Sequence, residues 1–192
     1  MSSAFAETEA GGVQPSATVR VWDPFVRMFH WSLVAFYAIA WATAENFTRA
    51  HVWVGYGIAA LLAFRVVWGF VGPRHARFSD FVRSPRDTFA YLRAMGVGRS
   101  PRFIGHNPAG GAMIVVMIAA LAATGLTGWL MVGPLWGREW IEEIHKLLAD
   151  APLVLVGLHL TGVLVSSIAH GENLVRAMIT GQKRAGEPGR KM

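Results

Sequence analysis

Four long apolar segments place the tightest limit on how this chain can fold. Each is close to the length of about 20 residues that a helix needs to cross the hydrocarbon core of a bilayer. In chain order, the predicted spans are residues 24–44, 51–71, 109–133 and 145–169. Of the 192 residues, 53% are hydrophobic and only 16% are charged, which argues against a water-soluble domain. We predict an all-α integral membrane protein whose four-helix bundle occupies residues 20–180.

The basic residues predict how these spans are oriented. The connection 72–108 contains seven arginines, and five more Lys and Arg residues follow residue 170. The two other connections are short and mix basic with acidic side chains. Because Lys and Arg accumulate in cytoplasmic loops, we expect both termini and the long connection to be cytoplasmic. The net charge of +6 is then explained by topology, and we expect no nucleic acid partner.

Three segments outside the spans have characters of their own. Residues 1–19 are small and polar and lack the features of a signal peptide, so we expect a disordered cytoplasmic tail. Residues 181–192 are expected to form a basic cytoplasmic tail. Within the long connection, "SPRDTFAYLRAM" predicts a short amphipathic helix capped by Ser84. That helix would lie on the inner leaflet, although a helix that docks a partner would have the same pattern.

Four histidines form two sets at matching depths in the predicted bundle. His145 and His159 are fourteen residues apart, so they share one helix face about 21 Å apart along the axis. His51 begins its span on the same side of the membrane as His145. His30 precedes Glu45 by fifteen residues, which places it about 22 Å below that surface, close to the level of His159. The depths therefore predict the pairs His51/His145 and His30/His159.

The paired depths predict ligation of two non-covalent b haems, with all four histidines as axial ligands of the haem iron. Burying a neutral imidazole in hydrocarbon is costly unless a metal or a hydrogen-bond partner compensates it. The absence of cysteine excludes iron–sulfur clusters and covalent c-type haem. A single histidine near a helix end is more often an interfacial residue, and one pair could relay protons. The histidines could also belong to a haem-free transporter that moves protons or metal ions.

Two arginines are further candidates for cofactor binding. Arg27 and Arg65 lie within or near predicted spans, where each could extend to the inner surface or pair with haem propionates. His75 and His106 are expected at the surface of the cytoplasmic loop and His170 at a helix end, with their roles left open.

Two features of the later spans are expected to shape the bundle. The third span has no ionisable residue and is expected to serve as scaffold, with Thr124 and Thr127 available for hydrogen bonds to neighbouring helices. Pro152, between the two histidines of the fourth span, is expected to kink that helix.

The stretches "RMFHWSLVAFY", "HVWVGY", "HKLLADAPLVLVGLH" and "HGENLVRAMITG" resemble the bacterial cytochrome b561 family. This family shares its four-helix module with the b-type cytochrome subunits of nickel–iron hydrogenases. The likeness runs from about Val21 to Lys183. It implies a bundle with two b haems and assigns the axial roles to His30, His51, His145 and His159.

The resemblance also implies a function. We expect a multi-pass protein of the bacterial inner membrane that carries electrons between the quinone pool and a redox partner in a respiratory chain. The partner would be a c-type cytochrome, a hydrogenase or a similar dehydrogenase, and a homodimer is left open. An electron-transfer subunit is favoured over a free-standing enzyme. The alternative is a superoxide:quinone oxidoreductase acting alone, for which Lys146, beside His145, is the one nearby cation.

Overall fold

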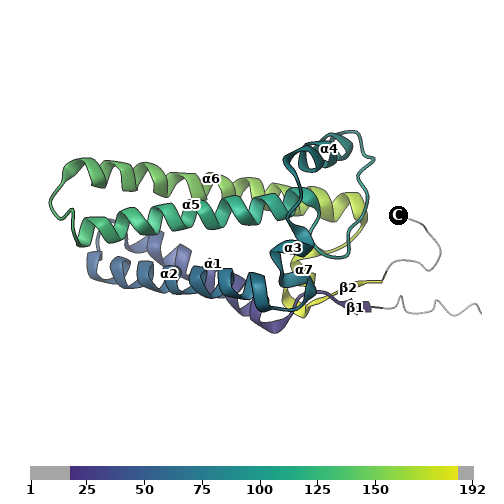
Figure 1. Ribbon diagram of the computed structural model, residues 1–192, viewed down its shortest axis with the longest axis horizontal. Helices are drawn as coiled ribbons and strands as arrows, with labels where there is room; N and C mark the ends of the chain where they lie inside the picture. Colours follow the sequence, from purple (N-terminus) through teal and green to yellow (C-terminus); the bar gives the residue numbers. More distant parts are fainter. Residues whose placement is uncertain (1–17, 186–192) are drawn as a thin grey trace, which may run out of the picture.

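The computed structural model describes residues 18–185 and consists mainly of four long helices that lie side by side (Figure 1). Their bounds are α1 Pro24–Thr43, α2 Thr48–Val71, α5 Pro108–Val132 and α6 Glu139–His170. All four are long and apolar enough to cross a membrane. The predicted four-helix bundle is therefore confirmed, although α2 begins at residue 48 and α6 at residue 139, earlier than we expected.

Local sequence signals explain where several helices begin and end. Asp23 caps α1, because its Oδ1 accepts hydrogen bonds from the amides of Phe25 at 2.9 Å and Val26 at 3.1 Å. Asn107 caps α5 in the same way through the amide of Gly110, at 2.7 Å. Each cap is followed by a proline at the first helical position. Gly171 ends α6 in the left-handed conformation, with φ of 57°.

The bundle is built from two helical hairpins. α1 packs along α2, α5 packs along α6, and the hairpins meet mainly where α2 packs against α5. A small core joins them, formed by Ala40, Ile58, Leu62 and Leu121. Many large apolar side chains point outward and are exposed, as expected for surfaces that face lipid tails. Within residues 18–185, the backbone of α6 does not pack against α1 or α2 as closely as it packs against α5.

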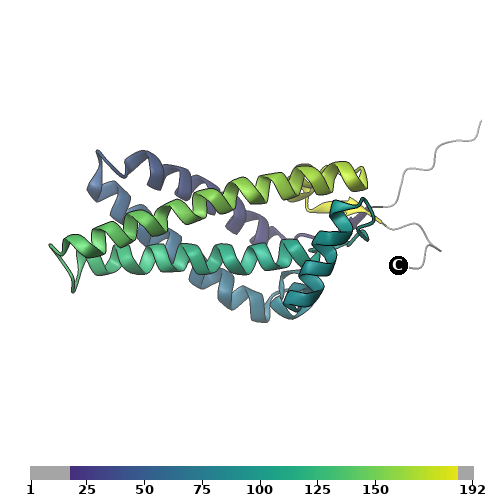
Figure 2. The same cartoon turned by 90° about the horizontal axis from the view of Figure 1, so that it is seen from above.

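The two ends of the bundle differ, and we name them by what they carry. The turn end holds the short connections 44–47 and 133–138. The terminal end holds the remaining elements and both ends of the described chain (Figures 1 and 2). Those elements are β1 Thr18–Arg20, the 3-10 helix η1 Arg74–Ala76, α3 Phe78–Phe81, α4 Pro85–Gly96, α7 Leu174–Thr180 and β2 Gln182–Arg184.

A two-stranded antiparallel sheet at the terminal end corrects our expectation for the two tails. Thr18 pairs with Arg184, Val19 with Lys183 and Arg20 with Gln182. Residues 18 and 19 were predicted to be disordered, and 182–184 were predicted to belong to a tail. The two segments instead satisfy each other's backbone groups, since they leave the bundle side by side. The rest of the N-terminal prediction, residues 1–17, and residues 186–192 lie outside the described part of the chain.

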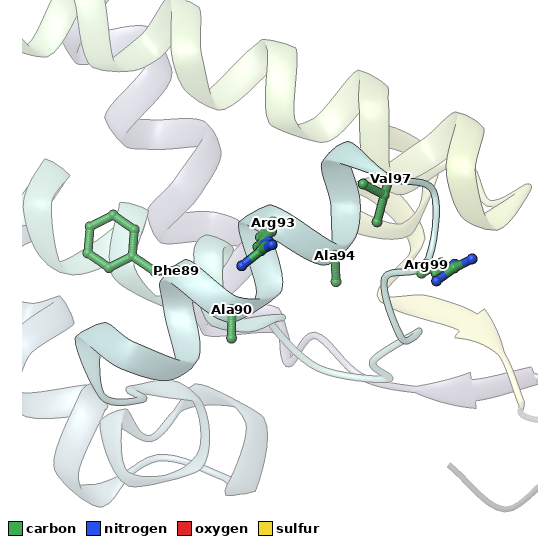
Figure 3. A pocket seen from close by; sticks show the side chains of 6 residues that line it. All are labelled: Phe89, Ala90, Arg93, Ala94, Val97 and Arg99. Carbon is green, nitrogen blue, oxygen red and sulfur yellow. The ribbon is translucent and has the colours of Figure 1, made fainter.

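The amphipathic helix predicted in the long connection is present as α4. The Ser84 hydroxyl accepts a hydrogen bond from the amide of Asp87 at 3.2 Å, which confirms the predicted cap. Tyr91 is buried against the bundle, whereas Phe89 and Leu92 are exposed. Figure 3 shows the hollow on the outer side of this helix, lined by Phe89, Ala90, Arg93, Ala94, Val97 and Arg99. Its contact with the inner leaflet stays a prediction.

Pro152 lies inside α6, which remains one continuous helix from residue 139 to 170. Proline lacks the amide that would donate to the carbonyl four residues earlier, here that of Leu148. The Thr124 hydroxyl of α5 donates to this oxygen at 2.9 Å. Pro152 itself is fully buried. A neighbouring helix thus supplies the hydrogen bond that the proline removes.

Candidate functional site

The structure brings the four predicted histidines together in two pairs. The ring centres of His51 on α2 and His145 on α6 are 6.2 Å apart, with the ring planes at 89°. Those of His30 on α1 and His159 on α6 are 6.5 Å apart, with the planes at 51°. Both pairs follow the partition predicted from depth. The first pair lies toward the turn end and the second toward the terminal end, about 21 Å apart along α6.

The spacing within each pair suits two imidazoles on one metal ion. An imidazole nitrogen binds a transition metal at about 2 Å, so two rings on opposite sides of the metal hold their centres about 6 Å apart. All four side chains are partly buried. A Cβ added to Gly55, one turn after His51, would have no described neighbour within 4 Å. The same holds for Gly162, one turn after His159.

Hydrogen bonds fix the ring nitrogens of the turn-end pair. His51 Nδ1 lies 2.9 Å from the carbonyl oxygen of Ala40. His145 Nδ1 lies 3.1 Å from the carbonyl oxygen of Thr124 and 3.0 Å from the hydroxyl of Thr127. Because these carbonyl oxygens only accept, Nδ1 carries the proton in each ring and Nε2 keeps its lone pair. That is the tautomer that a metal-binding histidine requires.

The terminal-end pair has a different environment. The Nδ1 atom of His30 is buried and has no hydrogen-bond partner among residues 18–185. The Trp31 indole lies perpendicular to the His30 ring, with 5.1 Å between ring centres. A buried polar atom without a partner is rare and costs free energy. The two pairs therefore differ at Nδ1: both turn-end histidines have a hydrogen-bond partner there, and His30 has none among residues 18–185.

The third span contributes more than scaffold: the expected hydrogen bonds from Thr124 and Thr127 to a neighbouring helix are present, and their contact with His145 was not predicted. Thr124 and Thr127 contact His145 from α5, and a Cβ added to Gly128 would lie 3.1 Å from the His145 ring. Gly128 thus leaves room for the imidazole. The motif "TGLTG" carried the signal for those bonds, since two threonines at i, i+3 share one helix face and their hydroxyls can bond to a neighbouring helix. The sequence did not show that this face meets His145.

Arg65 is buried in the bundle and does not extend to the surface, because its relative exposure is 3%. Its guanidinium lies over the rings of Phe78 and Phe81, at 5.0 and 5.7 Å from their centres. Its Nη1 has no hydrogen-bond partner in the described chain. His30 is six residues after Pro24 on α1 and Arg65 is six before the end of α2, so both are about 9 Å from the terminal end.

Arg27 lies close to Arg65 in depth and on the same helix as His30. It precedes His30 by three residues, which places the two side chains on neighbouring positions of one face of α1. Its guanidinium donates to the carbonyl oxygen of Ile179 in α7, while Nε is buried without a partner within residues 18–185. Both predicted arginines thus retain a buried donor that an anionic group could use.

His106 corrects our expectation of a surface residue. Its ring packs between Trp22 at 4.4 Å and Phe81 at 4.8 Å, measured between ring centres, and its Nδ1 is buried. Burial, together with the positive charges of Arg65 and Lys183, lowers the pKa of His106 to about 3. The ring is therefore neutral at physiological pH. It closes the terminal end of the bundle next to the buried Arg65.

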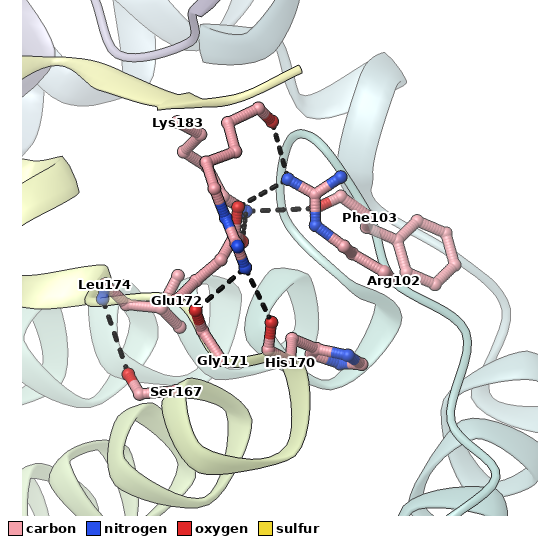
Figure 4. Close-up of polar contacts among 9 residues, drawn as sticks. Arg102, Phe103, Ser167, His170, Gly171, Glu172, Leu174 and Lys183 are labelled. Atoms are coloured by element: carbon pink, nitrogen blue, oxygen red, sulfur yellow. Dashed lines mark hydrogen bonds and ion pairs between the residues drawn. The ribbon is translucent and has the colours of Figure 1, made fainter. Parts of the chain in front are cut away.

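An ion cluster joins the long connection to the C-terminal segment (Figure 4). Glu172 pairs with Arg102 and, at 3.3 Å, with Lys183, whose ammonium also donates to the carbonyl oxygen of Phe103 at 2.9 Å. Burial alone would raise the pKa of the Glu172 carboxyl. The hydrogen bond from Arg102 and the charges of Lys183 and Arg102 outweigh burial and lower that pKa. The cluster holds the segment that contains His106 against β2.

The two remaining histidines are not brought to either pair. The Nδ1 of His75 lies 2.9 Å from a carboxylate oxygen of Asp80, in the loop after α2. His170 is the last residue of α6, where its carbonyl oxygen accepts a hydrogen bond from Arg184. Both serve the local structure of the terminal end.

Comparison with known proteins places this arrangement in a family. Residues 21–181 match the model of the family described as prokaryotic cytochrome b561. The chain belongs to the prokaryotic cytochrome b561 family. It is also 24% identical over 220 aligned positions to a protein of Bradyrhizobium diazoefficiens named "Probable Ni/Fe-hydrogenase B-type cytochrome subunit". That alignment covers 87% of this chain and 86% of the relative. No solved structure matches the chain significantly.

Membership of the cytochrome b561 family, with the four apolar helices, gives the broad character of the protein. It is a multi-pass protein of the inner membrane, binds haem b and takes part in electron transport. The reading of the histidines as a haem-free transport site is therefore wrong. The ring separations of both histidine pairs, and the free Nε2 atoms of His51 and His145, fit a haem whose iron takes two axial imidazoles.

Proposed function

We propose that this cytochrome b561 binds two b haems, one between each histidine pair, and carries electrons across the inner membrane between the quinone pool and a redox partner. His51 and His145 would bind one iron, and His30 and His159 the other. The observation that carries the proposal is the separation of 6.2 and 6.5 Å between the paired rings. Two such pairs, about 21 Å apart along α6, span much of a hydrocarbon core about 30 Å thick.

A b haem held by two imidazoles supplies a one-electron Fe(III)/Fe(II) couple. The residues around it position the ligands and set the local charge. The Nδ1 atoms of the turn-end ligands are held by Ala40, Thr124 and Thr127. Arg27 and Arg65 lie near the level of His30 with buried donors, so we propose that they pair with haem propionates at the terminal end.

The charge distribution supports a cytoplasmic location for the terminal end. The arginine-rich connection 72–108 and the basic C-terminal segment both belong to this end. Three buried nitrogen atoms at this end have no partner in the described chain, and they belong to Arg27, Arg65 and His106. Together with α4 they support a quinone-facing region at this end, because the carbonyl oxygens of a quinone accept hydrogen bonds. The turn end would then face the periplasm.

The relative named as a hydrogenase subunit supports a particular class of partner. We propose that a hydrogenase or a similar membrane-associated dehydrogenase exchanges electrons with this chain, and a c-type cytochrome is the alternative. The superoxide reaction gains no support, because the Lys146 ammonium lies 2.6 Å from the Glu142 carboxylate. Its charge is balanced, so it offers no isolated cation to attract an anion toward His145.

Electron transfer through both sites can be tested in sealed proteoliposomes. Ferricyanide is enclosed, a quinol is added outside, and the loss of ferricyanide absorbance is followed. We expect the native protein to exceed empty liposomes, and His30→Ala and His145→Ala to fall to the empty-liposome rate. His75→Ala is the matched control, since His75 lies outside both pairs. Native rates in both pair variants would contradict the proposal.

A further inference from the structure

The ring of His145 is held by one turn of α5, residues 124–128. Thr124 contributes its carbonyl oxygen, 3.1 Å from His145 Nδ1, and Thr127 its hydroxyl oxygen, 3.0 Å from the same atom. The Thr127 side chain is buried, with a relative exposure of 8%. Both contacts cross from α5 to α6, so they constrain the ring independently of the helix that carries it.

The donors and acceptors in this turn can be assigned from the atoms involved. The Thr127 hydroxyl has one proton, and carbonyl oxygens lie 2.9 Å away on Thr124 and 3.2 Å away on Ala123. It donates that proton within α5, which leaves its oxygen lone pairs free to accept. The N–H of His145 is therefore shared between the Thr127 hydroxyl and the Thr124 carbonyl.

A second contact fixes the turn itself against α6. The Thr124 hydroxyl donates to the carbonyl oxygen of Leu148 at 2.9 Å, the oxygen that Pro152 leaves without its helical donor. Leu148 is three residues after His145, about one helical turn away. Gly128 completes the turn by leaving space beside the His145 ring. This turn of α5 thus donates one hydrogen bond to α6 beside Pro152 and offers two acceptors to His145.

We propose that the Thr124–Thr127 turn is the positioning element for His145 and lowers the reduction potential of the haem that His145 binds. This inference rests on the proposed function. An imidazole that donates from Nδ1 becomes a more basic ligand through Nε2. A more basic ligand favours Fe(III) over Fe(II), which lowers the potential.

The two pairs differ in the features that set a reduction potential, so we can infer which haem has the lower one. Both turn-end ligands have acceptors at Nδ1, since His51 meets the carbonyl of Ala40 at 2.9 Å. At the terminal end, His30 Nδ1 has no partner in the described part of the chain, and Arg65 lies at its level. A nearby positive charge raises a potential, because it stabilises the reduced, less positive iron. The turn-end haem is therefore the lower-potential one.

The decisive experiment is a redox titration of the purified protein with its haems bound, following the α-band of each haem. Thr127→Val removes the acceptor while nearly keeping the shape of the side chain. Because a neutral hydrogen bond alters an equilibrium constant by up to about tenfold, we expect one component to rise by up to about 59 mV. The other component should not move. In a His30→Ala background, which keeps the turn-end haem alone, the same rise identifies the shifted haem.

Two variants of Thr127 and one control separate this effect from a loss of packing. Thr127→Ser keeps the hydroxyl and should keep the native potential. Thr127→Ala removes the acceptor with a smaller side chain and must shift the same component in the same direction. Thr161→Val is the control, because the Thr161 hydroxyl donates only to Gly157 within α6, at 2.9 Å, and is exposed.

The outcomes distinguish the inference from the proposed function. Two bound haems with unchanged potentials in Thr127→Val and Thr127→Ala would overturn the inference and leave the proposed function standing. An equal shift of both components, or the same shift in Thr127→Ser, would also overturn it, since neither requires the acceptor at His145. A native preparation without bound haem would overturn the proposed function itself.

Discussion

The hydrogen bond between Thr124 and Leu148 allows a test of how α6 keeps a buried proline. Pro152 removes one helical donor, and the Thr124 hydroxyl replaces it at 2.9 Å. The same hydroxyl lies 3.0 Å from the carbonyl oxygen of Ala120, its alternative acceptor within α5. Thr124→Val should therefore leave the Leu148 oxygen unsatisfied, while Ala120 retains its own backbone donor.

The size of the effect follows from the cost of a buried carbonyl. An unsatisfied buried acceptor costs about 1–3 kcal/mol, whereas side-chain hydrogen bonds between membrane helices average about 0.6 and reach about 1.7 kcal/mol. We expect Thr124→Val to lower the free energy of unfolding by about 1 kcal/mol. In a Pro152→Ala background the new amide can donate to Leu148, so the same change should cost only a few tenths. The coupling between the two positions, which is the difference between these costs, should be about 0.7 kcal/mol.

The free energy of unfolding is measured for the native chain, the two single variants and the double variant. The assay is reversible unfolding in mixed micelles with increasing dodecyl sulfate, followed by tryptophan fluorescence. Thr161→Val in both backgrounds is the control and should show no coupling, because its hydroxyl bonds only within α6. The same cost for Thr124→Val with and without Pro152 would refute the reasoning.

Three further predictions concern the histidine pairs and the terminal end. His51→Ala should remove one haem and leave the other, as judged by haem per chain in a pyridine haemochrome assay; loss of both or neither would count against the pairing. Arg65→Met should weaken binding of the terminal-end haem about tenfold or more and lower its potential, because a charged hydrogen bond contributes about 1.5–3 kcal/mol, whereas Arg65→Lys should lose less; haem titration of the apoprotein measures both. The pKa of His106 is lowered to about 3, so the folded state resists protonation that the unfolded state accepts below about 6.5. Stability should therefore be complete above that pH and fall by at most about 2 kcal/mol by pH 5, and a His106→Asn variant with an equally steep loss in thermal unfolding would contradict this assignment.

Much of the bundle could be predicted because the bilayer limits the choices. Length and apolarity located the four long helices, and the histidine depths gave pairs whose rings do meet in space. Helical rise and periodicity convert spacing in sequence into depth in the membrane and position on a helix face. Neither quantity depends on side-chain packing.

The features that sequence reasoning missed depend on contacts between distant segments. The acceptors for His145 come from α5, eighteen and twenty-one residues earlier in the chain, and spacing alone does not show which face of α5 meets α6. His106 was expected at the surface because it lies in the long connection between two spans, yet Trp22 and Phe81 enclose it. The kink predicted at Pro152 stays a prediction, and spacing in the sequence did not show that a hydroxyl of α5 replaces the donor that this proline removes.

The central claim is that the two histidine pairs bind two b haems in one chain. The most direct measurement is the haem content of the purified protein by pyridine haemochrome assay, with a dithionite-reduced minus oxidised spectrum. We expect close to two b haems per chain, both low-spin and slow to bind carbon monoxide, since each iron would have two axial imidazoles. A single haem would show that one pair is wrongly assigned, and a folded protein without haem would contradict the claim altogether.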